Sequence, residues 1–190
     1  MHLTSTSRRS LLLGAFAAIT LPRAALAQNP NAPDPMGVYV GAGGMMQRFY
    51  HDLSRAIAQK RYSQSRFIRA YFTDELAALY FRTQKEAGDE LSWSVDVDAI
   101  LNAQDVPDKL IYQGSKPLKV TEREALIAVT SEAFGETRTF RYLMRNVKQG
   151  WRIDEIFYEE GDDYGLRAFI AAARKRRRED LAKAKKPQRP

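Results

Sequence analysis

Alternating apolar and polar side chains over residues 124–160 constrain the fold more than any other feature of the chain. Within residues 139–145 every second side chain is large and apolar, as in a strand that packs one face on a core. The flanking runs 125–134 and 151–158 are rich in β-branched and aromatic residues, which strands favour. The segment therefore predicts three adjacent antiparallel strands.

Turn residues separate these strands. Gly135-Glu136 predicts one hairpin, and Lys148-Gln149-Gly150 predicts the next, with Gly150 at the position that needs a positive φ. In the last strand the apolar positions shift by one residue near Asp154-Glu155, which indicates a β-bulge and hence a strongly bent sheet. Helices must cover the concave face of such a sheet, so we expect an α+β domain.

Helical periodicity lies on both sides of the sheet segment. Apolar residues recur every three or four positions from Met45 to Ile57, and a second short stripe covers residues 67–72. Thr73 is a favourable N-cap for a third helix that ends near Gly88. Residues 166–173 predict a C-terminal helix. Residues 106–118 are expected to form a loop that enters a further strand near residues 119–122.

The first 27 residues have the pattern of an export signal. Arg8-Arg9 precedes a weakly apolar run that ends at Leu21, and Ala25-Leu26-Ala27 resembles a cleavage site. The paired arginines and the modest hydrophobicity favour the twin-arginine route over an ordinary Sec signal. The apolar run is also too short to span a bilayer. We therefore predict cleavage after Ala27 and a periplasmic location.

Charge is distributed unevenly over the remaining segments. We expect a Pro/Gly-rich linker at 28–41, one domain at 42–173 and a basic, disordered tail at 174–190. Residues 28–173 carry 18 basic and 21 acidic residues, 18 − 21 = −3, whereas the tail carries 9 − 2 = +7. The domain is therefore not basic, and nucleic acid is not an expected partner. The absence of cysteine excludes disulfides and thiolate metal sites.

The tail has two interpretations. A charge run of this kind is usually a solvated, frayed end of the chain, but it could also contact an anionic surface such as lipid. The residues that would make this contact are Arg174, Lys175, Arg176, Arg177 and Arg178.

Few motifs in the domain indicate chemistry. Asp96 and Asp98 share a face if their segment is extended, and such a pair could hold a divalent cation or divide acid and base roles. Solvent-facing alternation is the preferred interpretation, because no third carboxylate or histidine lies at ligand spacing. Residues 41–44 read as a flexible lead into a helix and not as a phosphate loop. Arg141 and Arg145 share one face of a strand, where they could bind an anion or pair with Glu132 and Asp154. No metal site and no cofactor are predicted.

Several motifs in order carry a family resemblance. They are Phe49-Tyr50, Asp98 followed by Gln104-Asp105, the Gly-Trp-Arg-Ile-Asp-Glu-Ile run at 150–156, and Leu166-Arg167. Over about residues 42–172 the chain resembles the nuclear-transport-factor-2-like (NTF2-like) superfamily, and within it the exported bacterial family called domain of unknown function 3828 (DUF 3828). The resemblance implies a cone with N-terminal helices packed on a bent antiparallel sheet around a pocket. It implies no established activity.

Three functions remain open, of which a non-catalytic domain that binds a small ligand or an envelope protein is favoured. The alternatives are an enzyme of the isomerase, dehydratase or hydrolase type that uses a pocket carboxylate, and an envelope-surface protein that acts through the tail. A homodimer is compatible with each. The candidate pocket residues are Tyr50, Trp93, Asp96, Asp98, Gln104, Asp105, Arg141, Tyr142 and Tyr158.

Overall fold

The computed structural model describes residues 35–90, 94–95, 97–158 and 164–184, with side chains from residue 41 onward. The predicted signal peptide, the linker up to residue 34, and Trp93 and Asp96 of the candidate pocket lie outside the described residues. The elements are α1 (Pro35–Ala58), α2 (Gln64–Tyr71), α3 (Asp74–Ala87), β1 (Leu110–Val120), β2 (Glu124–Ala133), β3 (Glu136–Val147), β4 (Gly150–Phe157) and α4 (Leu166–Ala184). The domain is therefore α+β, as predicted.

The four strands form one antiparallel sheet in the order β1-β2-β3-β4. β2 and β3 pair without interruption from Glu124 opposite Arg145 to Ala133 opposite Glu136. Phe134 and Gly135 connect them with φ values of 57° and 77°, the positive pair that a two-residue type I′ turn requires. This turn lies one residue earlier than predicted. At the second hairpin Gly150 has the predicted positive φ, at 94°.

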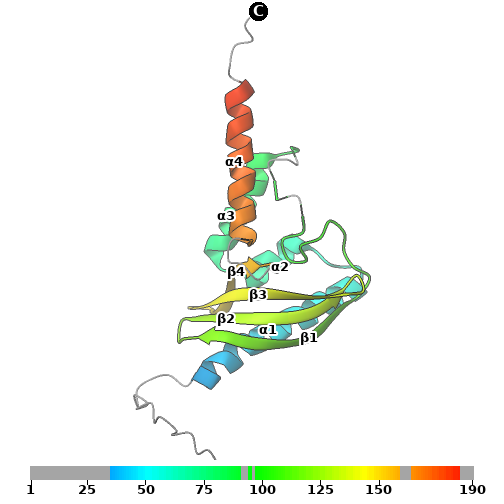
Figure 1. Ribbon diagram of the computed structural model, residues 1–190, viewed down its shortest axis with the longest axis vertical. Helices are drawn as coiled ribbons and strands as arrows, with labels where there is room; N and C mark the ends of the chain where they lie inside the picture. Colours follow the sequence, from blue (N-terminus) through cyan, green and yellow to red (C-terminus); the bar gives the residue numbers. More distant parts are fainter. Residues whose placement is uncertain (1–34, 91–93, 96, 159–163, 185–190) are drawn as a thin grey trace, which may run out of the picture. The chain divides into compact units, whose positions relative to one another are not determined.

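The predicted bulge is present in β4. Leu143 pairs with Glu155 and Met144 with Ile153, so Asp154 is the extra residue. The strongly bent sheet, however, was a wrong expectation, because the sheet is not strongly curled (Figure 1). The bulge lies in an edge strand, and the central β2–β3 pair has no shift in register. A single bulge in an edge strand bends that strand but does not change the register of the central strands.

β1 is longer than the sequence predicted. Its eleven residues include most of the expected loop 106–118, together with Pro117. Proline is tolerated there because β1 is an edge strand whose outer N–H groups need no partner. The β1–β2 register shifts on both sides of this region, between Tyr112 and Gly114 and between Pro117 and Lys119. Proline and irregular pairing both discourage another strand from adding to this edge.

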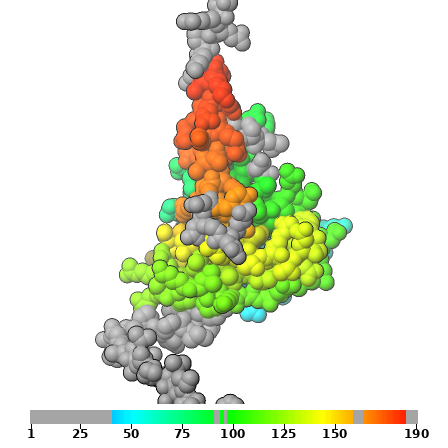
Figure 2. Space-filling model, viewed as in Figure 1, coloured from blue at the N-terminus to red at the C-terminus, as the bar shows by residue number. Residues whose placement is uncertain are grey.

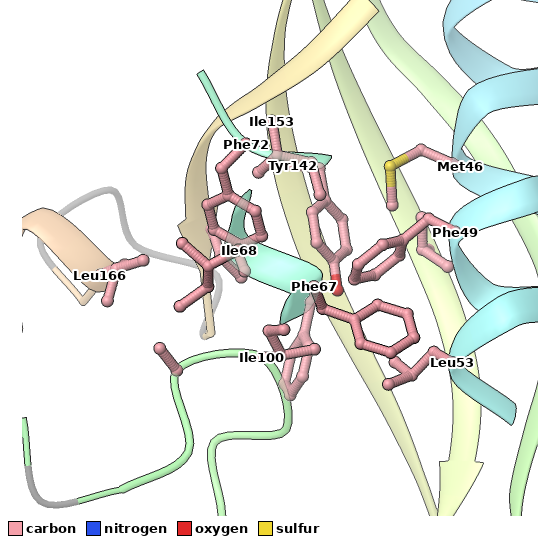
Figure 3. Close-up of a cluster of buried hydrophobic side chains, with 14 of the residues drawn as sticks. Met46, Phe49, Leu53, Phe67, Ile68, Phe72, Ile100, Tyr142, Ile153 and Leu166 are labelled. Atoms are coloured by element: carbon pink, nitrogen blue, oxygen red, sulfur yellow. The ribbon is translucent and has the colours of Figure 1, made fainter. Parts of the chain in front are cut away.

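α1 lies along one face of the sheet, and α4 lies beside α3 (Figure 1). The core fills the space between α1 and the sheet. In Figure 3, Met46 and Phe49 of α1 point toward Tyr142 of β3, and Phe67 and Ile68 of α2 contribute from another side. On the face of the sheet away from α1, residues of β1, β2 and β3 are visible at the molecular surface (Figure 2).

α3 begins and ends as predicted. The Thr73 hydroxyl accepts a hydrogen bond from the backbone N–H of Leu76 at 3.3 Å, and Gly88 follows the last residue of the helix. This N-cap satisfies one of the donors that the first helical turn leaves without a backbone partner.

α1 begins earlier than the sequence predicted, because residues 35–41 of the expected linker are helical. Pro35 is the first residue of α1, a position that suits proline because its N–H is not needed there. Gly41 is also required by packing. A Cβ at this position would lie 2.9 Å from Nε1 of Trp151, so a larger residue would push the helix away from β4. Gly41 therefore belongs to the helix and is not part of a flexible lead.

α4 likewise continues beyond its predicted end near Arg174. It reaches Ala184, so the first eleven residues of the expected disordered tail are helical. Contacts described below hold this part of α4 to α3. None of the described helices is both long and apolar enough to cross a membrane.

Candidate functional site

All three predicted pocket tyrosines, Tyr50, Tyr142 and Tyr158, are core residues. The hydroxyl oxygens of Tyr50 and Tyr142 lie 2.8 Å apart, and the Tyr158 hydroxyl donates to the carbonyl oxygen of Ala99 at 2.7 Å. Burial raises the pKa of Tyr50 to about 12 and raises the pKa of Tyr142 well above its ordinary value, so both keep their protons. The structure thus brings Tyr50 and Tyr142 together, but inside a filled core. Figure 3 shows Tyr142 among the packed apolar side chains of this core.

Asp98 is the best placed of the predicted acids, yet its oxygens already have partners. Oδ2 accepts from the Tyr62 hydroxyl at 2.7 Å, while Oδ1 accepts from the N–H groups of Ile100 and Leu101 at 2.8 and 2.9 Å. Burial raises the pKa of Asp98, and these hydrogen bonds oppose the rise. Asp98 organises its own loop and does not face any of the described hollows.

The other predicted residues lie apart from these. Gln104 and Asp105 are exposed in the loop before β1. Arg141 is half-buried, and its guanidinium lies 5.1 Å from the centre of the Phe157 ring. Its neighbour on the same face, Arg145, contacts Asp154, one of the two acids proposed as its partners. Nε of Arg145 lies 3.2 Å from Oδ2 of Asp154, as an ion pair without hydrogen-bond geometry.

Three of the tail arginines contact other parts of the domain. Arg174 and Arg177 reach Glu86 of α3 at 3.8 and 3.4 Å, and Arg176 donates to the Ser94 carbonyl oxygen at 3.4 Å. Lys175 pairs within α4 with Glu179 at 3.8 Å, and Arg178 is exposed. This part of α4 is therefore held against α3 through Glu86.

A hollow of about 510 Å³ lies between α1 and α2, and sequence analysis did not predict it. The aromatic residues Phe67 and Tyr71, with Ala56 and Ala70, supply its apolar surface. Its lining residues are Asp52, Arg55, Ala56, Gln59, Arg61, Arg66, Phe67, Ala70 and Tyr71. We call this hollow the α1–α2 groove. Three arginines and one carboxylate give its lining a net positive charge.

The three arginines of the groove differ in their contacts. Arg55 pairs with Asp52 one turn earlier on α1. The side chains of Arg61 and Arg66, in contrast, are exposed and have no hydrogen-bond or ion-pair partner among the residues that the structure describes. Two guanidinium groups therefore face the groove region with their donors open to solvent or to a ligand. Guanidinium forks match carboxylate and phosphate oxygens in geometry as well as in charge.

A signal in the sequence could have indicated this groove. Residues 53–73 contain five basic residues and no acidic residue. The net charge of −3 for residues 28–173 conceals this stretch, because the acidic residues lie elsewhere. The fold then places the end of α1 beside the start of α2, which gathers three of the five cations around one hollow.

A second hollow of about 500 Å³ lies between α1 and Tyr112 of β1. Arg48 and His51 line it together with Tyr50 and three small or polar residues of α1. It carries fewer cations than the α1–α2 groove. Among the described residues, no cluster of three or more His, Asp or Glu side chains could hold a metal ion.

At the junction of β4 and α4, Arg167 is surrounded by acidic side chains, unlike the arginines of the groove. Arg167 contacts Asp154 at 3.3 Å, Glu155 at 3.6 Å and Glu75 at 3.4 Å. The side chain of Asp154 is only 3% exposed and also accepts from the Thr73 hydroxyl at 2.8 Å. Glu155 accepts from the backbone N–H of Arg167, at the first turn of α4. The junction is therefore an ion network that holds α4 on the sheet.

Comparison with known proteins gives little to add to this geometry. No protein-family model matches the chain, and the comparison with curated proteins gives no match either. Among solved structures, a phospholipid-binding protein from Ralstonia solanacearum in complex with a phospholipid is similar, with a TM-score of 0.41 and 13% identity. The match covers 76% of this chain and 89% of that one. With this TM-score and identity, the similarity supports no conclusion about the fold or the ligand of this chain. The resemblance to the DUF 3828 family remains a prediction.

Proposed function

We propose that this protein is a non-catalytic binding domain that takes a small anionic ligand in the α1–α2 groove. The observation that carries the proposal is the pair Arg61 and Arg66, which are without acidic partners beside a hollow of about 510 Å³. A ligand with a carboxylate or phosphate group could bridge these guanidinium groups, and an apolar part could pack on Phe67.

Binding fits the side chains of the domain better than catalysis does. Asp98, a candidate pocket acid, accepts one hydrogen bond from the Tyr62 hydroxyl and two from backbone N–H groups of its own loop. A general base needs an approach to the proton that it removes. The groove offers no such base, since its carboxylate Asp52 is engaged by Arg55 and Tyr71.

The proposal also includes an export route and a family for this protein. We propose secretion through the twin-arginine pathway, cleavage after Ala27 and action in the periplasm, on the evidence of Arg8-Arg9 and the weak apolar run. Membership of the NTF2-like superfamily and of DUF 3828 rests on the order of the motifs quoted above. Docking on an envelope surface through α4 has less support, because Arg174, Arg176 and Arg177 have partners on or near α3.

Isothermal titration of the full chain with phenyl phosphate tests the groove. We expect the double substitution Arg61→Ala/Arg66→Ala to lower the affinity at least about tenfold, since a hydrogen bond to a charged group contributes about 1.5–3 kcal/mol. Arg82→Ala is the matched control, because Arg82 is an exposed arginine of α3 that does not line the groove. Equal binding by the double variant and the parent would place any anion site elsewhere.

A further inference from the structure

Asp52 is the single carboxylate among the described residues that line the α1–α2 groove. One oxygen accepts from the Arg55 guanidinium, and the other accepts from the Tyr71 hydroxyl at 2.5 Å. The Asp52 side chain is 32% exposed, so it is neither sealed in the core nor free in solvent. It occupies the donors that an anionic ligand in this groove would also use.

The charges around Asp52 keep this arrangement in place at neutral pH. The hydrogen bond from Tyr71 lowers the pKa of Asp52, and Arg55 and His51 lower it further against the effect of burial. Burial and the neighbouring carboxylate raise the pKa of Tyr71 to about 12, so Tyr71 remains a donor. Arg48 is a further cation near Tyr71. Asp52 is thus a permanent negative charge inside a positive groove.

We infer that Asp52 is a built-in counter-ion that competes with the ligand for Arg55 and Tyr71 and thereby sets the affinity of the groove. This inference rests on the proposed function. In the empty groove Asp52 holds Arg55 on α1 and ties α1 to Tyr71 of α2. When an anion binds at Arg61 and Arg66, it meets the repulsion of Asp52 or replaces Asp52 on one of its donors.

The inference has a quantitative consequence, because Coulomb repulsion from a fixed charge is proportional to the charge of the ligand. Asp52→Asn removes that charge while it keeps the size of the side chain and an oxygen that can accept from Tyr71. If removal of the charge strengthens binding of a monoanion about fivefold, a dianion of similar shape should gain about 25-fold, the square of that factor. A merely structural role for Asp52 would not produce this relation.

Titration of the full chain at pH 8 with benzenesulfonate and with phenyl phosphate provides the measurement. The two probes share an aryl ring, and phenyl phosphate is a dianion at this pH because a phosphate monoester has a second pKa of about 6. We expect both probes to bind Asp52→Asn more tightly than the parent, with the larger gain for phenyl phosphate. Asp52→Ser is a second neutral variant in case the first is unstable. Tyr71→Phe, which changes no charge, should alter both affinities by one common factor.

The outcomes separate the inference from the function on which it rests. Equal gains for the two probes, or weaker binding by both neutral variants, overturn the counter-ion role. If Arg61→Ala/Arg66→Ala nevertheless loses affinity, the groove remains the binding site. Absence of binding by the parent and by both Asp52 variants overturns the inference and the proposed function together. Binding by the neutral variants alone supports an inhibitory counter-ion.

Discussion

The α1–α2 groove and the β4–α4 junction place the same side chain in opposite settings. At the junction Arg167 contacts three carboxylates, and one of them, Asp154, is 3% exposed. In the groove Arg61 and Arg66 are exposed and have no acidic partner within the described chain. Removal of an arginine that pairs with buried acids leaves those acids without a partner and destabilises the fold. An exposed arginine without an acidic partner contributes little to the free energy of unfolding, and its guanidinium is available to a ligand.

From this comparison we expect the largest loss of stability from a substitution at the β4–α4 junction. Arg167→Ala should lower the free energy of unfolding by about 2–3 kcal/mol, somewhat less than for a fully buried pair because Arg145 and Thr73 still contact Asp154. Urea denaturation measures this change. The matched variant Arg61→Ala/Arg66→Ala should stay within about 0.5 kcal/mol of the parent, as exposed substitutions do. Similar losses in both variants would remove the distinction between the two regions.

A smaller effect tests whether packing, and not charge, positions the helix that carries Asp52 and Arg55. Gly41→Ala should cost about 1 kcal/mol, because overpacking against Trp151 outweighs the gain in helix propensity. Gly44→Ala is the control in the same helix, since nothing lies within 4 Å of the added Cβ, and it should stabilise by up to about 1 kcal/mol. Thermal unfolding of both variants decides the point. Stabilisation by both would mean that Trp151 does not restrict α1.

Truncation after Ala173 should have a modest effect on the fold. It removes the contacts of Arg174 and Arg177 with Glu86, which are partly exposed and together contribute about 1 kcal/mol or less. Phenyl phosphate binding by the groove should remain unchanged, while any co-sedimentation with anionic vesicles through the tail should be lost. If the truncated chain loses phenyl phosphate binding but stays folded, α4 must contribute to the site.

The smallest effect concerns Asp98, whose pKa is raised by burial. A group with a higher pKa in the folded state binds a proton more tightly when folded, so its contribution to stability grows as the pH falls toward the unfolded pKa. The stability of the parent relative to Asp98→Asn should therefore increase between pH 7 and pH 4. Denaturation of both proteins across this range tests the sign. If the stability of the parent relative to Asp98→Asn decreases as the pH falls, the pKa of Asp98 is not raised by burial.

Local patterns in the sequence predicted the elements that depend on local chemistry. The alternation around Tyr142, the N-cap at Thr73 and the bulge at Asp154 all follow from neighbouring residues and are present. The extent of β1 and the start of α1 depend instead on distant contacts. Pro117 is compatible with a strand only at a sheet edge, and Gly41 in a helix is explained only by Trp151. Neither partner can be inferred from nearby sequence.

The site was harder to predict than the fold, because residue type does not reveal burial. Tyr50 and Tyr142 do meet, but their hydroxyls bond to each other inside the core. Asp98 was expected to face a pocket or solvent, and it caps its own loop instead. The net charge of −3 over residues 28–173 does not reveal the groove arginines, because acidic residues elsewhere in the domain offset them. The absence of acids across residues 53–73 was the informative quantity.

The two-residue turn at Phe134 and Gly135 has a consequence for the order of folding. It closes a loop of only two residues, and the ten pairs between β2 and β3 then form in sequence without a shift in register. Short loops cost little entropy to close, whereas the Tyr50–Tyr142 contact joins residues 92 positions apart. We expect the β2–β3 hairpin to gain hydrogen-exchange protection first during refolding. Helix α4 should dock late, since Arg167 can contact Asp154 and Glu155 only after β4 has joined the sheet.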